Sequence, residues 1–167
     1  NINIISDLFD CKITTSIKSI ESNEQSEITE PVRFLCVPVP DKSDVTLEDC
    51  FVTYLEQEQL SLWETSNHKK EQATKITYIK SYPKYLIFQI KRYNKNNKLN
   101  IGIGTDDKWV SDIFPSNIYY ILKGFVVQHG SMSGGHYISY VKLNNQWYCF
   151  NDDIVTSLEK MGTKAIG

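Results

Sequence analysis

Residues 134–153, GGHYISYVKLNNQWYCFNDD, place a histidine and a polar triplet at the same end of a predicted β-hairpin. Two runs of alternating apolar residues flank an Asn-Asn pair at 144–145, which tolerates the positive φ that a two-residue turn requires. This turn sets a register that pairs His136 with Asp153. Because side chains alternate across a strand, the same register puts Asn151 on the face of His136, diagonal to it and within side-chain reach.

An imidazole at position 136 that donates one ring N–H to the Asn151 oxygen keeps its other nitrogen free and its tautomer fixed. Such a pair is the base and the orienting residue of a nucleophile–base–orienter triad. Gly134 and Gly135, just before the histidine, leave room for a substrate backbone. The alternative is that His136 is an ordinary hydrogen-bonded surface residue and the Gly-Gly pair an ordinary loop.

The nucleophile of such a triad is not evident among the four cysteines, Cys11, Cys36, Cys50 and Cys149. Cys149 shares the face of His136, but it lies about four residues along the strand, roughly 13 Å away, and we interpret it as core packing. The four positions are far apart and contain no CxxC motif. This spacing favours reduced thiols in a cytoplasmic or nuclear protein.

The composition is that of one soluble globular domain. The chain has 167 residues, of which 41% are hydrophobic and 23% charged, with a formal net charge of −2. Lysines are scattered among acids and asparagines, which argues against a nucleic-acid partner. No apolar run approaches the roughly 18 residues of a membrane span, and no signal peptide is evident. The first residue is Asn, so we expect a piece of a longer chain.

The sequence predicts more strand than helix. Alternating and β-branched residues indicate strands at 1–20, 32–40, 75–83, 84–93 and 119–130, in addition to the hairpin. The run Tyr85–Ile90 is nearly all apolar, so we expect a central strand buried on both faces. The last segment, 157–167, is compatible with a short helix.

One clear helix is expected within 41–60, where apolar residues recur at helical spacing. Thr46 or Asp44 is its expected cap. The polar stretches 21–31 and 94–109 are predicted to be a loop or hairpin tip and a flexible connection. Strands with one early helix indicate an α+β fold around an antiparallel sheet.

Several of these segments resemble the ubiquitin-specific proteases, a papain-like class of deubiquitinating cysteine enzymes. GGHYISYVKLNNQWYCFNDDIVT resembles the histidine box of that family, and YPKYLIFQIKRY resembles a strand with the pattern P-x-x-L-I-x-x-L-K-R-F. YYILKGFVVQHGSMSGGHY resembles the strand and loop before the catalytic histidine. LFDCKITTSIKSIES and LEDCFVTYLEQEQL resemble the start of the fingers subdomain and the helix that follows. The resemblance runs through nearly the whole chain, in order.

The resemblance implies a partial papain-like α+β domain. Fingers would be formed by approximately 11–40 and 60–80, and an antiparallel palm with the histidine box by 81–167. The family's cysteine box, an Asn-x-Gly-Asn-Thr-Cys-type segment, does not occur in these residues. The thumb and the nucleophilic cysteine are therefore expected outside this chain.

The resemblance also assigns roles to individual residues. His136 becomes the general base, Asn151 its orienter and Asp152 a neighbouring acid that assists. The substrate tail would meet four further residues in or beside the 131–135 loop, with part of 94–109 supplying the opposite loop; the four are Ser133, Gly134, Gly135 and Tyr137.

The implied activity of the intact domain is thiol-dependent hydrolysis of isopeptide or peptide bonds after the C-terminal glycine of ubiquitin. Ubiquitin or ubiquitinated proteins would be the partners, no cofactor is expected, and this piece alone should be inactive. Three alternatives stay open: a catalytically inactive ubiquitin-binding scaffold, a papain-like hydrolase of another ubiquitin-like modifier, and an unrelated β-rich domain with a chance motif.

Many members of the family hold a zinc ion at the fingertip with two CxxC pairs. At the matching positions this chain has Ser19 and Ser22, then approximately Glu64 and Asn67. Hydroxyl and amide oxygens are poor zinc ligands compared with thiolates, so we predict no structural zinc. The fingertip, 18–30, is then expected to be held only by strand pairing.

Overall fold

The structure of the protein is a computed structural model that describes residues 3–94, 97–99, 101–104, 108–131 and 133–159. It divides into two compact units. The first contains the residues up to Pro38 together with Phe51–Ile90, and the second contains Val39–Cys50 and the residues from Lys91 onward. The boundary falls inside helix α2, Leu47–Leu55.

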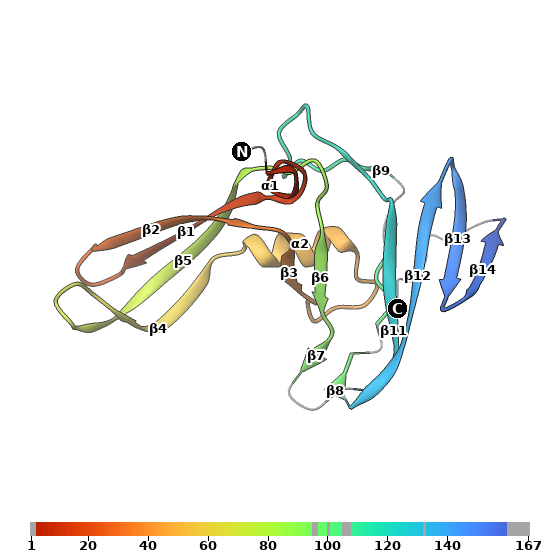
Figure 1. The fold of residues 1–167 in the computed structure, drawn as a ribbon. Coiled ribbons are helices and arrows are strands. Elements are labelled where there is room, and N and C mark those ends of the chain that lie inside the picture. Colours follow the sequence, from red (N-terminus) through yellow and green to blue (C-terminus); the bar gives the residue numbers. More distant parts are fainter. Residues whose placement is uncertain (1–2, 95–96, 100, 105–107, 132, 160–167) are drawn as a thin grey trace. The chain divides into compact units, whose positions relative to one another are not determined.

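The first unit is built on a four-stranded antiparallel sheet, here called the N-terminal sheet (Figure 1). Its strands are β1 (Cys11–Ser19), β2 (Gln25–Val32), β4 (Glu58–Glu64) and β5 (Lys70–Ser81), in the order β2-β1-β5-β4. The polar segment 21–31, predicted as a loop or hairpin tip, thus contributes most of a strand. Since β2 is an edge strand, its charged side chains remain in water while its backbone pairs with β1.

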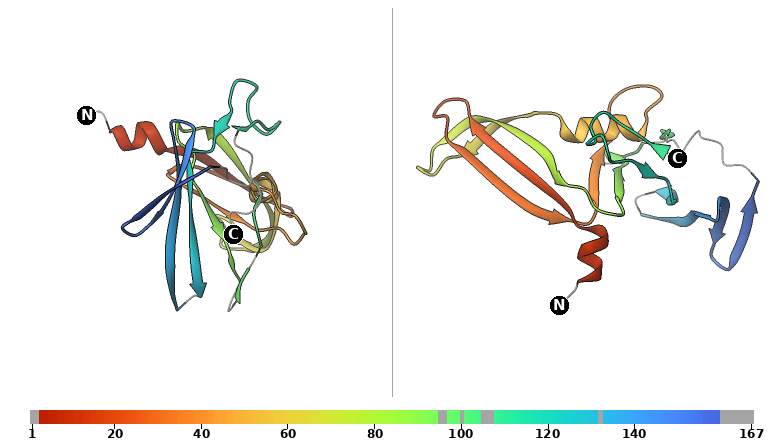
Figure 2. Two further views of the ribbon diagram at one scale, coloured as in Figure 1. Left: turned by 90° about the vertical axis from the view of Figure 1, so that its right-hand side faces the viewer. Right: turned by 90° about the horizontal axis from the view of Figure 1, so that it is seen from above.

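The prediction of a strand throughout 1–20 is wrong for its first part, because Ile4–Phe9 form helix α1. Asn3 caps this helix, with its side-chain oxygen 3.4 Å from the Ser6 amide, and Asp7 lies in the first turn. Strand preferences of β-branched residues are weak enough that such a cap overrides them. Figure 2 shows α1 leading into β1 at one end of the N-terminal sheet.

The expected central strand at Tyr85–Ile90 is also wrong. Strand β6 (Phe88–Lys91) pairs only with β3 (Leu35–Pro38) in the described part of the chain. Alternate residues of the segment are half-buried, and Tyr85 and Ile87 are 42% and 44% exposed, so the segment is not buried on both faces. The apolar run does not reveal how many partners a strand has.

Helix α2 begins at the predicted cap. The Thr46 hydroxyl accepts from the Asp49 amide at 3.1 Å, while the Asp49 carboxylate accepts from the Thr46 amide at 2.8 Å. This reciprocal pair satisfies two donors at the helix start. Lys42 lies 2.8 Å from the same carboxylate, and the Lys42 and Thr46 contacts lower the Asp49 pKa to about 2. Phe51 on this helix is fully buried and meets Phe88 edge-on at 5.6 Å.

The second unit contains a second four-stranded antiparallel sheet, here called the C-terminal sheet, whose strands follow in chain order. They are β11 (Gly124–Ser131), β12 (Gly134–Leu143), β13 (Gln146–Asn151) and β14 (Ile154–Leu158). Trp147 is buried in it beside Phe125, with ring centroids 5.9 Å apart. Strand β14 takes up the start of the expected C-terminal helix, and 160–167 lie outside the described residues.

Short strands occupy the region predicted as a flexible connection. They are β7 (Tyr93–Asn94), β8 (Asn97–Lys98) and β9 (Lys108–Trp109), and β9 pairs with β10 (Tyr120–Ile121). β7 and β8 form a hairpin. Among the helices described, none is long and apolar enough to cross a membrane.

The cap of α2 can be tested by Thr46→Ala, which removes the hydroxyl that accepts from Asp49. We expect the free energy of unfolding, measured by urea denaturation, to fall by about 1 kcal/mol. Ser43→Ala is the matched control, since Ser43 is exposed just before the cap. Equal unfolding midpoints for the two variants would contradict the assignment.

Candidate active site

The predicted hairpin is present in the C-terminal sheet with the predicted register. Asn144 and Asn145 have φ values of 48° and 64°, as a two-residue turn that follows the twist of its strands requires. Leu143 pairs with Gln146, and the ladder continues as far as Ser139 and Phe150. Two local features, the turn and the strand alternation, therefore determine which side chains share a face.

The expected pairing of His136 with Asp153 is wrong. Strand β13 ends at Asn151, Asp152 turns the chain with φ 51°, and Asn151 pairs with Ile154 of β14. Asp153 is thus drawn into a second tight turn. The backbone partner of His136 is His129 on β11.

The structure brings His136 and Asn151 together. The imidazole Nε2 lies 2.5 Å from the Asn151 side-chain oxygen. Since an amide oxygen only accepts, Nε2 carries the proton and Nδ1 keeps its lone pair. His136 is exposed and Asn151 is half-buried. This geometry allows Nδ1 to accept a proton from a thiol or from water.

The other predicted site residues lie nearby without joining this hydrogen bond. Asp152 is exposed in the turn after β13. Ser133 pairs with the Ser131 hydroxyl at 2.9 Å, in the connection between β11 and β12. Tyr137 is 65% exposed and follows His136 directly, so it projects from the opposite face of β12.

The two glycines before the histidine differ in how much space their surroundings leave for a side chain. A Cβ on Gly134 would meet nothing within 4 Å, which is the open space expected at both positions. A Cβ on Gly135 would lie 2.3 Å from the His129 carbonyl oxygen and 2.2 Å from the side-chain nitrogen of Gln128. Gly135 is exposed, but its neighbours leave no room for a side chain.

Three of the four thiols, those of Cys11, Cys50 and Cys149, are poorly suited to act as a nucleophile for His136. Burial raises the pKa of Cys11 to about 11, and burial together with the Asp49 charge raises that of Cys50 to about 11, so both stay protonated at neutral pH. Cys36 is half-buried in β3. Cys149 lies directly across from Tyr140, four strand positions from His136 and roughly 13 Å away.

Ser19 and Ser22, at the positions that match the family's first pair of zinc ligands, form a hydrogen-bonded group with Glu71, here called the tip cluster. Ser19 and Ser22 both donate to one carboxylate oxygen of Glu71, at 2.5 and 2.6 Å. The Ser19 oxygen also accepts from the Ser22 amide at 3.0 Å. Ser19 and Glu71 are buried, 1% and 8% exposed. The expectation that strand pairing alone holds this tip is therefore wrong.

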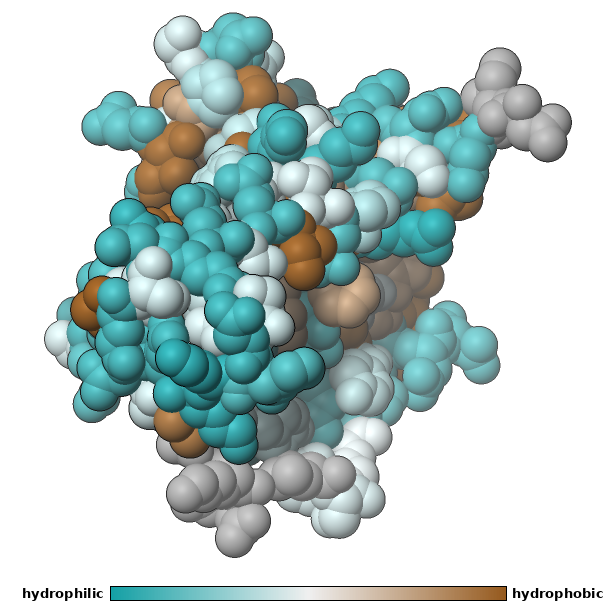
Figure 3. Space-filling view, turned by 90° about the vertical axis from the view of Figure 1, so that its left-hand side faces the viewer, coloured by the Kyte–Doolittle hydropathy of each residue, from teal (hydrophilic) through white to brown (hydrophobic). Residues whose placement is uncertain are grey.

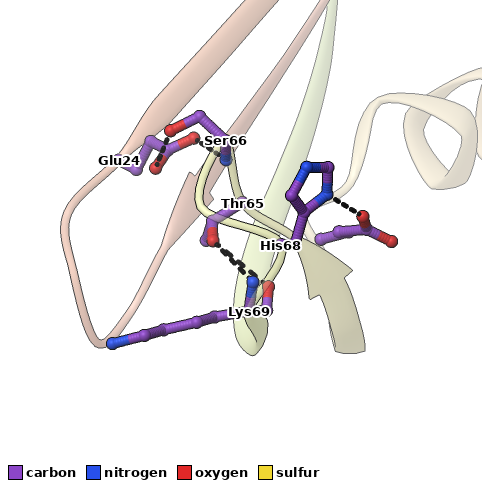
Figure 4. Close-up of polar contacts among 6 residues, drawn as sticks. Glu24, Thr65, Ser66, His68 and Lys69 are labelled. Carbon is purple, nitrogen blue, oxygen red and sulfur yellow. Dashed lines mark hydrogen bonds and ion pairs between the residues drawn. The ribbon is translucent and has the colours of Figure 1, made fainter.

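The region that matches the family's second pair of zinc ligands, approximately Glu64 and Asn67, carries its own hydrogen bonds (Figure 4). Glu24 accepts from the Ser66 amide at 2.7 Å and so links the two turns of the N-terminal sheet. The Thr65 hydroxyl donates to the Lys69 carbonyl at 3.2 Å, and His68 lies 2.8 Å from Glu64. Figure 3 views the molecule from the side of these turns, where the surface is mostly hydrophilic.

These residues do not fit a zinc ion. The Ser19 and Ser22 hydroxyls are engaged with Glu71, and no thiolate is present in the cluster. In the described ranges, no group of three or more His, Cys, Asp or Glu side chains is arranged to hold a metal. Hydrogen bonds take up the positions at which the family resemblance placed metal ligands.

Sequence reasoning missed Glu71 and Gln128. Glu71 lies two residues before the fully buried Ala73 on β5, so its side chain is on the buried face of the strand. A buried carboxylate needs hydrogen-bond partners. That position was a usable signal. Gln128, which contacts Gly135, lies in an ordinary strand run that contains no comparable signal.

The carboxylate of the tip cluster predicts a pH dependence. Hydrogen bonds from Ser19 and then Ser22 lower the pKa of Glu71 below its ordinary value. The resulting stability is therefore present above the unfolded-state pKa and is lost as the pH falls through the folded one. Urea midpoints of the protein and of Glu71→Gln should differ at about pH 6 and converge towards about pH 3. Glu27→Gln, on exposed strand β2, is the control; a pH-independent difference for Glu71→Gln would contradict this prediction.

The two glycines give a matched pair of variants. Gly135→Ala places a Cβ against the His129 carbonyl, a backbone atom that cannot move aside cheaply. We expect a loss of about 1–3 kcal/mol in the free energy of unfolding. Gly134→Ala enters open space and should change it by less than about 0.5 kcal/mol. Urea denaturation compares them, and similar losses would show that the two positions are not distinct.

Comparison with known proteins is consistent with this geometry. A sequence model of the family described as ubiquitin carboxyl-terminal hydrolase matches residues 1–165. Ubiquitin carboxyl-terminal hydrolase Usp2 of Drosophila melanogaster is 27% identical over 92% of the chain, which covers 18% of that relative. Ubiquitin carboxyl-terminal hydrolase 4 is 30% identical in Saccharomyces cerevisiae strain YJM789 and in Candida glabrata, over 89% and 90% of the chain and 20% of each relative.

The chain thus spans about a fifth of the length of these relatives. The match over nearly every residue confirms the resemblance found in the sequence. The antiparallel sheets and two helices accord with a papain-like fold in part. The chain belongs to the ubiquitin carboxyl-terminal hydrolase family.

Proposed function

We propose that this chain is the histidine-bearing part of a deubiquitinase, which hydrolyses isopeptide or peptide bonds after the C-terminal glycine of ubiquitin. His136 is the general base, Asn151 orients it, and the nucleophilic cysteine lies outside the 167 residues. The single observation that carries this proposal is the 2.5 Å contact between the His136 Nε2 and the Asn151 oxygen, within a chain of this family.

The contact supports the role of base because it leaves one nitrogen available and fixes the ring. A proton on Nε2 obliges Nδ1 to act as the acceptor. The half-buried Asn151 holds the ring orientation, which a freely rotating surface histidine would lack. Cys11 and Cys50 are buried thiols with raised pKa values, so neither is ready to supply the nucleophile.

The chemistry then runs in two halves. Nδ1 of His136 takes the thiol proton, and the thiolate attacks the carbonyl carbon of ubiquitin's last glycine. As the C–N bond breaks, the same proton passes to the leaving amine and a thioester remains. His136 next takes a proton from water, whose oxygen attacks the thioester, and the proton returns to the departing thiolate. Free carboxyl and amine are the products, with no cofactor required.

The remaining site residues take supporting roles in this proposal. Asp152, exposed beside Asn151, would polarise water near the reacting carbonyl. The open space at Gly134, together with Ser133, Gly135 and Tyr137, would accommodate the extended tail of ubiquitin or of a ubiquitinated protein. The N-terminal sheet would form the fingers, approximately 11–40 and 60–80, and 81–167 the palm. All four cysteines are free thiols, which suits the cytoplasm or the nucleus.

A non-catalytic ubiquitin-binding scaffold is the second candidate. It is favoured by one observation, namely that Cys149, the thiol of the C-terminal sheet, lies roughly 13 Å from His136 along that sheet. The retained hydrogen bond between His136 and Asn151 favours the enzyme, because a binding module does not require an oriented imidazole. Trapping the nucleophile separates the two.

The test uses the full-length protein and a ubiquitin whose C-terminus carries a thiol-trapping warhead. Intact mass spectrometry should show stoichiometric labelling of the wild type. His136→Ala should slow labelling by about 10²–10⁴-fold, because the thiol loses its base. Asn151→Asp keeps an acceptor oxygen and should retain labelling that Asn151→Leu loses.

His68→Ala is the matched control, since this histidine is exposed and its ring lies 2.8 Å from Glu64. Labelling that does not depend on His136 would contradict its role as base. Ubiquitin binding without any labelling would establish the scaffold, and the absence of both would contradict the family function for this chain. A panel of other ubiquitin-like modifiers with the same warhead determines which modifier is recognised.

A further inference from the structure

The side chain of Gln128 is held by three hydrogen bonds at the end of β11. Its amide oxygen accepts from the Tyr93 hydroxyl at 3.0 Å and from the Lys98 ammonium at 2.9 Å. Its amide nitrogen donates to the Ser131 carbonyl at 3.2 Å. Two donors on one side and a carbonyl on the other fix the amide in a single orientation.

Lys98 binds the backbone of the same strand. Its ammonium donates to the main-chain carbonyl of Gln128 and lies 3.5 Å from that of Gly130. β11 is an edge strand of the C-terminal sheet, so alternate carbonyls point away from its partner β12. Lys98 therefore binds the edge of β11 that, in the described part of the chain, pairs with no other strand. Hydrogen bonds from a cation to carbonyl oxygens are among the stronger ones.

Gln128 also touches the far side of that connection. The space beside Gly135, the residue immediately before His136, is filled by the Gln128 side-chain nitrogen, which lies 2.2 Å from where a Cβ would be. One side chain thus contacts both ends of the β11–β12 turn, Ser131 and Gly135. Gln128 pairs with Tyr137, so it acts from the face of the strand opposite to His136.

We propose that Gln128, held by Lys98 and Tyr93, is a positioning residue that fixes Ser131 and Gly135 for binding of the ubiquitin tail. We call this group the latch. This inference rests on the proposed function. The latch joins the β7–β8 hairpin, through Tyr93 and Lys98, to Ser131 at the end of β11. Since the latch makes no contact with the imidazole, it governs where the tail binds and leaves proton transfer by His136 unchanged.

The test compares Gln128→Leu with wild type in the full-length protein. Loss of the latch should raise the KM for a ubiquitin with a fluorogenic C-terminal amide by about tenfold and change kcat by less than about twofold. Alkylation of the nucleophilic cysteine by iodoacetamide, which requires only the thiol and its base, should keep its rate and pH profile. Amide hydrogen exchange at Gly134 and Gly135 should accelerate.

Two further variants complete the set. Lys98→Arg keeps a cation at the edge of β11 and should restore most of the affinity that Lys98→Met loses. Lys123→Met, an exposed lysine before the other end of β11, should have no effect. An unchanged KM for Gln128→Leu, or an equal fall in alkylation, would overturn the latch. If wild type cleaves no ubiquitin conjugate, the proposed function fails, while unchanged amide exchange in Gln128→Leu would refute the latch independently.

Discussion

The functional reading depends on one hydrogen bond, from Nε2 of His136 to the side-chain oxygen of Asn151. It exists because the turn at Asn144 and Asn145 fixes the register of β12 and β13. A one-residue slip of that register would move Asn151 to the other face of the sheet. The chemistry of the imidazole is thus determined by a turn at the opposite end of the hairpin.

Polar interactions position the rest of the functional region. Lys98 and Gln128 link segments 30 residues apart at the edge of β11. In the N-terminal sheet, Glu71 joins Ser19 at a separation of 52 residues. In each case a charged group satisfies several buried or edge groups at once, which specifies one arrangement of the chain. Apolar packing supplies the cores beneath them, around Phe51 in one unit and Trp147 in the other.

The features that could be predicted from the sequence depend on residues close together in the chain. The hairpin register follows from two turn residues and strand alternation, and α2 starts after Thr46, one of its two predicted caps. Partners distant in sequence could not be predicted in this way. The apolar run of β6 is compatible with one or two neighbouring strands, and only the fold leaves Ile87 half exposed. Asp153 was misplaced because a second turn began where the first ladder was assumed to continue.

The ring of His136 offers the most direct measurement of this account. Nitrogen-15 NMR of histidine-labelled protein above neutral pH distinguishes a protonated from an unprotonated ring nitrogen, and the spectrum of His136→Gln identifies the signals. We expect one fixed tautomer, with the proton on Nε2 and a bare Nδ1, which is lost in Asn151→Leu. A proton on Nδ1, or averaging between the two tautomers in the unmodified protein, would contradict it.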